Sequence, residues 1–428
     1  MNTHTNQSHT MEHSRLKKYC ESKIHSLFRN SDIKKIHIHA KYDRNKSVSK
    51  YEKNDKLFNY KRPTAEIIGK VGHLYCFPGQ SYLDHYKKIY EHIGYEVTTD
   101  TVDKTLIRKT LDKIFPTDFT KTDIIILGYV EVLVGEDNWN GNDEIKWKQL
   151  LIGSKKVAFV GVTFSFWGDI IYHLTEILSK YCHTIIYVGK LGSLNSIDIP
   201  NHTIASGSSA FVDGKMITWT NIFANSPLIQ TGNHYTLPSI MDENRDWFNK
   251  VHKTFRFVDP ELGWIAKSAI DNKIAFSYLH LVTDNLEKTY TEDLTTEREP
   301  EVINKRMQYI GILKAILWHF LEQSPSLMAE VLKAQQARVD KGLLEPLTQN
   351  WKACLSFAYH TQEEAWEVVR ELPRRQWRDQ VIVPENILSE IADTQIQLLT
   401  TLAYAGFTEE ELADAVIKKL NAKRKDWK

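Results

Sequence analysis

The chain has 428 residues, in which 55 Lys and Arg nearly balance 54 Asp and Glu, and 42% of its residues are hydrophobic. This composition is typical of a globular protein of two or three domains, and it excludes a strongly basic nucleic-acid coat and an acidic disordered chain. No apolar run reaches the ~20 residues of a bilayer span, and the polar N-terminus lacks a secretory signal. The four cysteines show no CxxC spacing, so we expect a cytoplasmic protein without disulfides, a zinc site or a membrane partner.

Residues 1–60 are rich in Lys, His, Asn and Ser and contain only short apolar clusters. This composition predicts a polar, flexible N-terminal arm, with a contact surface for a partner or nucleic acid as the alternative. Because the net charge of the chain is only +1, nucleic-acid binding is not the expectation. The alternation Ile36-His-Ile-His favours an edge strand over a metal site.

Residues 61–300 alternate between apolar runs and amphipathic stretches. Short, β-branched apolar runs occur at residues 67–77, 123–127, 156–161, 184–189 and 278–282. Such runs are typical of strands buried on both faces, whereas the spacing at 170–180 predicts a helix. Strands alternating with helices predict a layered α/β domain.

Beyond residue 300 the strand pattern ends, and the sequence predicts a linker helix at 301–323 followed by an all-α domain at 324–428. Pro and Gly residues separate the predicted helices. These helices are expected at residues 324–339, 351–372, 385–404 and 409–425.

Two of these predicted helices carry clustered carboxylates. Glu363, Glu364 and Glu367 converge on one side of the first, because residues three and four apart share a helix face, and Glu390 and Asp393 do so on the second. Packed together, the helices would offer oxygen ligands to a small hard cation such as Mg²⁺. The alternative is an ordinary solvated helix face.

The order and spacing of these residues resemble the all-α nucleoside triphosphate pyrophosphatases of the MazG and dimeric dUTPase superfamily, over residues 324–428. The resemblance implies that the five carboxylates hold Mg²⁺ and that Glu364 is catalytic, activating a water that cleaves between the α- and β-phosphates. It also implies that Lys418, Asn421 and Arg424 bind phosphates. A basic helix end that complements the helix dipole is the alternative for these three residues.

The α/β region carries a second group of candidate residues. A turn with Gly189, Lys190 and Gly192 follows an apolar strand, and glycines there let backbone N–H groups approach a ligand. Glu261 precedes a helical stretch, and Asp284 ends a buried strand, where α/β sheets commonly bind ligands. A plain turn and solvated acids are the alternatives.

These segments, in this order, resemble the purine nucleoside phosphorylase and nucleosidase superfamily over residues 155–290. The resemblance implies a mixed central sheet with flanking helices. It further implies that Glu261 binds the ribose hydroxyls, that Asp284 protonates the purine N7, and that Thr283 orients this acid.

The chain departs from that family at Lys190, where Ser or Thr is usual, and a cation there favours a nucleotide substrate over a nucleoside. Glu131 and Glu136 are weak candidates for a water-activating acid. Hydrolysis and phosphorolysis therefore both remain open, the latter with inorganic phosphate as a second substrate.

Together, the two resemblances predict a bifunctional, Mg²⁺-dependent nucleotide-degrading enzyme that forms a homo-oligomer and acts in salvage, pool sanitation or antiphage defence. One alternative is a sensor, in which one domain binds a nucleotide and regulates the other. Another is a structural protein with decayed sites.

Overall fold

The computed structural model describes residues 13–29, 31–52, 54–224, 226–292, 299–322, 336, 356–358, 360–365, 384–408, 411–412, 415 and 418. The chain divides into two compact units, Met1–Glu322 and Gln323–Lys428. Among the described helices, none combines the length and the apolar character needed to cross a bilayer.

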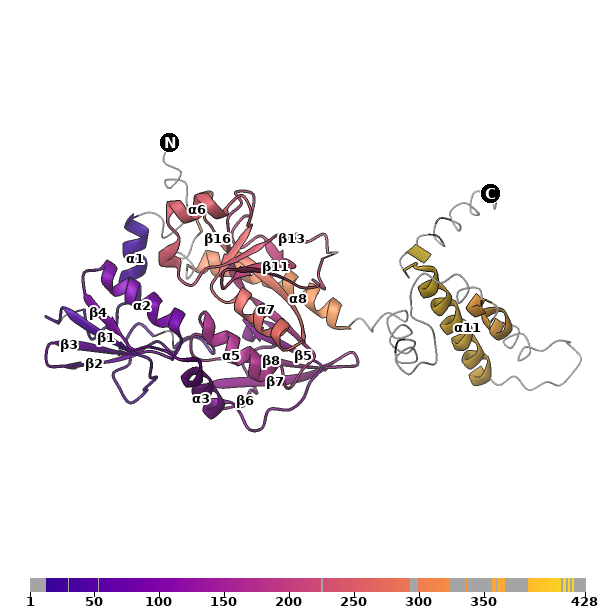
Figure 1. Cartoon of the computed structure of the whole chain (residues 1–428), viewed down its shortest axis with the longest axis horizontal. Coiled ribbons are helices and arrows are strands. Elements are labelled where there is room, and N and C mark those ends of the chain that lie inside the picture. The colour runs from indigo at the N-terminus through magenta and orange to yellow at the C-terminus, as the bar shows by residue number, and fades with distance from the viewer. Residues whose placement is uncertain are drawn as a thin grey trace, which may run out of the picture. The chain divides into compact units, whose positions relative to one another are not determined.

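A four-stranded sheet forms one part of the first unit, in the order β2-β3-β1-β4 (Figure 1). Strand β1 lies between β3 and β4 and runs parallel to both, whereas β2 pairs antiparallel with β3. The elements of this part are α1 (His13–Lys23), β1 (Lys35–His39), β2 (Thr64–Ile68), β3 (Val71–Tyr75), α2 (Gln80–His92) and β4 (Glu96–Thr99).

This sheet overturns two expectations from the sequence. Strand β1 is interior rather than an edge, and Ile36 and Ile38 are 1% and 0% exposed, so this stretch belongs to the core rather than to a flexible arm. The low apolar content of residues 1–60 suggested a flexible arm. A strand needs apolar residues on only one face to pack into the core, so a low content is enough. Both isoleucines join the core on that face, and His37 and His39, which alternate with them, occupy the other.

The larger sheet has twelve strands, and β9 pairs with β5, β15 and β16 at its centre. Strands β5, β8, β9 and β16 run parallel where they pair, and antiparallel strands flank them, so the sheet is mixed. Its strands are β5 (Ile124–Gly128), β6 (Asn140–Gly141), β7 (Ile145–Ile152), β8 (Lys155–Val162), β9 (Thr184–Ser193), β10 (Ile204–Ser206), β11 (Ser209–Val212), β12 (Lys215–Thr218), β13 (Ile229–Thr231), β14 (His234–Thr236), β15 (Phe257–Asp259) and β16 (Ala275–Asn285).

Helices cover both faces of the larger sheet. In β5, Ile125 and Leu127 enter one core cluster and Ile124 and Ile126 enter the other, as expected of a strand buried on both sides. The predicted layered α/β fold with a mixed sheet is thus confirmed for the first unit. The helices here are α3 (Lys104–Ile114), α4 (Glu131–Val134), α5 (Asp169–Leu178), η2 (Ile240–Asp242), α6 (Arg245–Val251), α7 (Leu262–Asp271) and α8 (Pro300–Glu322).

Helix α8 occupies the stretch for which the sequence predicts a linker. The structure instead packs it against the larger sheet, where Leu313, Leu317 and Leu321 are at most 1% exposed and join the core cluster of Ile126. The linker assignment is therefore wrong. A helix between two domains and a helix that completes one domain carry the same amphipathic pattern, so periodicity alone did not separate them.

The described residues of the second unit are mainly helical. Helix α11 (Pro384–Ala405) matches the helix expected at 385–404, and residues 356–358 and 360–365 are helical as well. Phe357 stacks on Tyr404 with ring centroids 5.3 Å apart, which packs the earlier helical segment against α11. The other helices predicted for this unit fall largely outside the described residues.

Candidate functional site

A cavity of about 860 Å³ lies in the first unit and brings together the residues that the sequence singled out in the α/β region. Strand β9, the start of α7 and the end of β16 each contribute part of its wall. The singled-out residues that line it are Gly189, Lys190, Gly192, Glu261, Thr283 and Asp284.

The register between β9 and β16 places Asp284 in this wall. Asp284 pairs with Gly192, and the pairing shifts at Thr283, an irregularity of the kind that re-aims side chains near ligand sites. The Asp284 side chain is buried, and the Thr283 hydroxyl donates to its Oδ1 over 3.4 Å. A Cβ on Gly192 would lie 3.0 Å from Asp284 Oδ2, so the absence of a side chain at this position leaves space for the carboxylate.

Glu261 is held at the start of α7 by its neighbour Asp259. One oxygen of Asp259 accepts from the backbone N–H groups of Glu261 at 3.0 Å and of Leu262 at 2.8 Å, which gives a partner to two backbone donors at the start of the helix. Burial raises the pKa of the Glu261 carboxyl well above its usual value, the Asp259 charge adds to the rise, and the Lys190 ammonium opposes it. Lys190 is thus a close electrostatic neighbour of Glu261.

Two buried histidines flank Asp259, and none of these three residues was assigned a role from the sequence. His234 Nε2 donates to Asp259 Oδ1 at 3.0 Å, and His280 Nε2 lies 3.7 Å from Oδ2. Burial alone would raise the pKa of Asp259, but the histidines, His234 first, hold it below its usual value. Burial lowers the pKa of His280 to about 4. The sequence does show an acid, Asp259, two positions before Glu261. Its histidine partners lie on β14 and β16, however, and only the fold brings them beside it.

Glu131, one of the two weak candidates for a water-activating acid, also lines the cavity. Its Oε2 is buried without a hydrogen-bond partner among the described residues. Burial raises its pKa, while Lys56 and Lys190 oppose that rise, so Glu131 shares Lys190 as a neighbour with Glu261. The other candidate, Glu136, is exposed and does not line the cavity.

The residues expected to form a flexible arm, together with Arg62 just beyond them, supply a basic wall of the cavity. Two acids, Glu21 and Glu52, also come from this stretch, but Glu52 accepts a bidentate pair of hydrogen bonds from Arg44 at 2.7 and 3.0 Å. The wall carries Lys18, Lys23, Arg29, Lys50, Lys56 and Arg62, named here the basic wall. It lines the same cavity as the acids of the larger sheet and Lys190.

Aromatic side chains complete the lining. Phe166 and Tyr187 contact each other edge to face at 6.2 Å, and Tyr129 lies beneath the Lys190 ammonium, which is 5.9 Å from its ring centroid. Planar rings of this kind offer surfaces on which a nucleobase stacks.

In the second unit the structure places three of the five predicted carboxylates together. Oxygen atoms of Glu364, Glu390 and Asp393 lie within 4.8 Å of one another, whereas Glu363 is exposed and outside that group. Lys418 is exposed. The remaining predicted residues, Glu367, Asn421 and Arg424, lie outside the described residues.

No protein-family model matches the chain, and no curated protein matches it in sequence. About half of it resembles solved structures. The 5′-methylthioadenosine/S-adenosylhomocysteine nucleosidase of Campylobacter jejuni is 12% identical over 47% of this chain and 99% of that one, with a TM-score of 0.38.

The purine nucleoside phosphorylase of Schistosoma mansoni is 12% identical over 52% of this chain and 97% of that one, with a TM-score of 0.37. That of Toxoplasma gondii is 15% identical over 46% and 90%, with a TM-score of 0.36.

Proposed function

We propose that the first unit cleaves the N-glycosidic bond of a purine nucleotide. The observation that carries this proposal is the composition of one cavity, in which Asp284, Glu261 and Lys190 share the space with the basic wall. Acids next to a sugar site suit a reaction through an oxocarbenium-like state, since the leaving base must be protonated and the sugar held.

The roles follow from position and charge. Glu261 accepts hydrogen bonds from the ribose hydroxyls, which stabilises the charged form that burial disfavours. Asp284 delivers a proton to the purine N7, so the bond between C1′ and N9 breaks with its electron pair moving into the base. Asp259 does not contact the reacting atoms and acts as a positioning residue for Glu261.

Glu131 favours hydrolysis over phosphorolysis. A carboxylate with a raised pKa and an unpartnered oxygen suits a general base, which takes a proton from the water that adds to C1′. The products are then a free base and a sugar phosphate. Strict dependence on added inorganic phosphate would instead indicate phosphorolysis and remove this role from Glu131.

A nucleotide is favoured over a nucleoside by the cations that line the cavity beside its acids. Lys190 and the basic wall offer N–H donors to phosphate oxygens, and charge-assisted hydrogen bonds of this kind are the strong ones. A nucleoside would offer these cations no phosphate oxygens.

The test is chromatography of ATP, AMP and adenosine after incubation with wild-type protein and with Lys190→Ala. We expect free adenine from wild type, and a preference for nucleotides over adenosine that falls at least ~10-fold in Lys190→Ala, the scale of one lost charge-assisted bond. Lys156→Ala, an exposed lysine outside the cavity, is the matched control. An unchanged preference would refute nucleotide selection by Lys190, and absence of free base would refute the glycosidase itself.

A second activity is proposed for the second unit because Glu364, Glu390 and Asp393 cluster there. Carboxylate oxygens fit a hard cation, and these residues would hold Mg²⁺. When bound, Mg²⁺ would neutralise phosphate charge and polarise a water for cleavage between the α- and β-phosphates. Lys418, Asn421 and Arg424 are proposed to contact the phosphates. Pyrophosphate release from ATP that Glu390→Gln abolishes is the test.

A further inference from the structure

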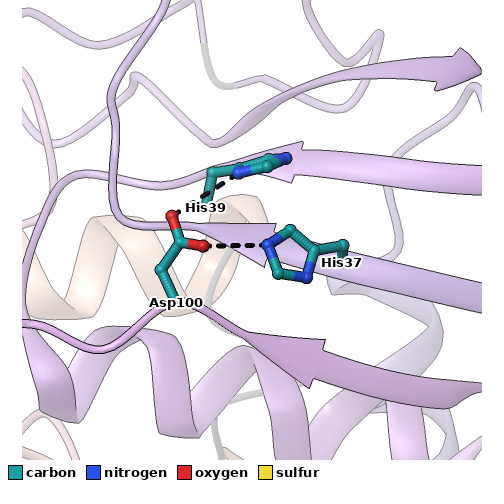
Figure 2. A group of neighbouring side chains, drawn as sticks. All are labelled: His37, His39 and Asp100. Atoms are coloured by element: carbon teal, nitrogen blue, oxygen red, sulfur yellow. Dashed lines mark hydrogen bonds and ion pairs between the residues drawn. The ribbon is translucent and has the colours of Figure 1, made fainter.

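A group of imidazoles and one carboxylate lies on the four-stranded sheet, and none of these residues lines the cavity of the glycosidase proposal (Figure 2). His37 and His39 are two residues apart on β1 and therefore share a face, opposite the buried Ile36 and Ile38. Asp100 directly follows β4, the parallel neighbour of β1, and its carboxylate reaches both histidines.

The ligand-type atoms converge at close range. His37 Nε2 lies 2.8 Å from Asp100 Oδ1, and His39 Nδ1 lies 3.5 Å from Asp100 Oδ2. A tetrahedral metal with ligand bonds of ~2.0–2.1 Å separates its ligands by about 3.3 Å, so only small shifts would admit an ion between these atoms.

The other nitrogen of each ring already has a partner. His37 Nδ1 is 2.8 Å from Thr98 Oγ1, and His39 Nε2 is 2.9 Å from His73 Nδ1. When these outer nitrogens donate, His37 Nε2 and His39 Nδ1 present lone pairs toward the Asp100 carboxylate, an arrangement that needs a cation or a proton between them. Outer hydrogen bonds of this kind orient histidines that ligate metals.

The surroundings allow an ion to enter. The side chains of His37, His39 and Asp100 are 29%, 24% and 38% exposed, so the group is open to solvent on one side.

We propose that His37 Nε2, His39 Nδ1 and Asp100 form a binding site for a divalent transition metal of the Zn²⁺ class, with a fourth position left to solvent. Two nitrogen donors and one oxygen donor favour this class over Mg²⁺ and Ca²⁺, which take oxygen ligands. His73 is a positioning residue, since it partners His39 through the nitrogen that does not face Asp100.

The test uses the full chain carrying Glu390→Gln, so that the carboxylate group of the second unit does not contribute. After removal of metals with a chelator, the protein is titrated with Zn²⁺ by calorimetry and with Co²⁺ by visible absorption. We expect one Zn²⁺ per chain, a tetrahedral Co²⁺ spectrum and no competition by Mg²⁺. In the same background, His73→Ala should weaken binding ~10–100-fold, as loss of an outer hydrogen-bond partner does, and Asp100→Asn or His37→Ala should weaken it more.

His183→Ala, which removes an exposed histidine elsewhere in the unit, is the matched control and should bind as the background protein does. Unchanged thermal unfolding in chelator establishes that each variant is folded. Binding weaker than millimolar, or equal affinity in the control and in both ligand variants, would overturn the proposal. If only one ligand variant folds, its retention of full affinity would overturn the proposal just as well. Base release plays no part in this readout, so the glycosidase proposal and the metal proposal fail separately.

Discussion

Asp284 and Gly192 lie opposite each other where β9 and β16 pair. Asp284→Asn keeps the shape of the side chain but removes the proton that the purine N7 is proposed to receive. We expect base release from ATP to fall ~10²–10⁴-fold, the usual contribution of a general acid, with thermal stability little changed. Chromatography of free adenine measures this, and undiminished release would remove Asp284 from the chemistry.

Gly192→Ala tests the same contact from the other side. The added Cβ would lie 3.0 Å from Asp284 Oδ2 and 3.1 Å from Leu286 Cδ1, so one of these neighbours must shift. Because a displaced acid loses its alignment with the base, we expect kcat to fall while KM for ATP changes little. A wild-type kcat would show that the carboxylate tolerates displacement.

Glu131 links the pH dependence of stability to that of activity. Its pKa is raised by burial, so the folded state holds the proton more tightly than the unfolded state does. Stability must then fall as pH rises from the unfolded pKa of ~4.5 through the higher folded pKa. We expect Glu131→Gln to be more stable than wild type at pH 7, and this difference to vanish below pH ~4.

The same substitution should abolish base release, because glutamine cannot take the proton of the attacking water. Thermal unfolding and adenine release, both followed from pH 4 to 8, give the two profiles. A variant that is less stable than wild type at pH 7, or that keeps the acid limb of the activity profile, would contradict the assignment of Glu131.

Among the helices and strands, the sequence predicted correctly those that can be recognised from the residues of one segment alone. The run that follows Asp123 is apolar from residue 124 to residue 127, and β5 indeed buries both faces. Strand β1 was predicted at the edge of a sheet, but it lies inside one. The alternation of Ile and His along it indicates one buried face and does not indicate which strands pair with it. Asp259 was missed for a related reason, since its partners His234 and His280 lie on other strands.

Substitutions in α8 distinguish a helix that belongs to the core of the first unit from a linker helix. Leu317 is 0% exposed, so Leu317→Ala should lower the free energy of unfolding of the first unit by ~2–5 kcal/mol, as truncation of a buried leucine does. Ile312, on the same helix, is 38% exposed, and Ile312→Ala should cost far less. Denaturant unfolding of the full chain measures both, and equal small effects would favour the linker.

For the whole molecule, the two proposed sites differ in what they require. The first uses acids and the basic wall of one cavity, whereas the second groups carboxylates that suit a divalent cation. Removal of Mg²⁺ with a chelator should therefore stop pyrophosphate release and leave base release intact. Asp284→Asn should have the converse effect, and Glu390→Gln should reproduce that of the chelator.

This separation also tests the alternative in which one unit senses a nucleotide and regulates the other. Independent sites predict that each variant loses one product and keeps the other within a factor of ~2, since sites that share no partners act additively. Regulation predicts that one substitution removes both products. A substitution that disables the regulating unit would then also change the state of the unit that it regulates. Separate quantification of adenine and pyrophosphate from one ATP incubation decides between them, and Glu363→Gln, an exposed acid outside the Glu364 group, is the matched control for the second unit.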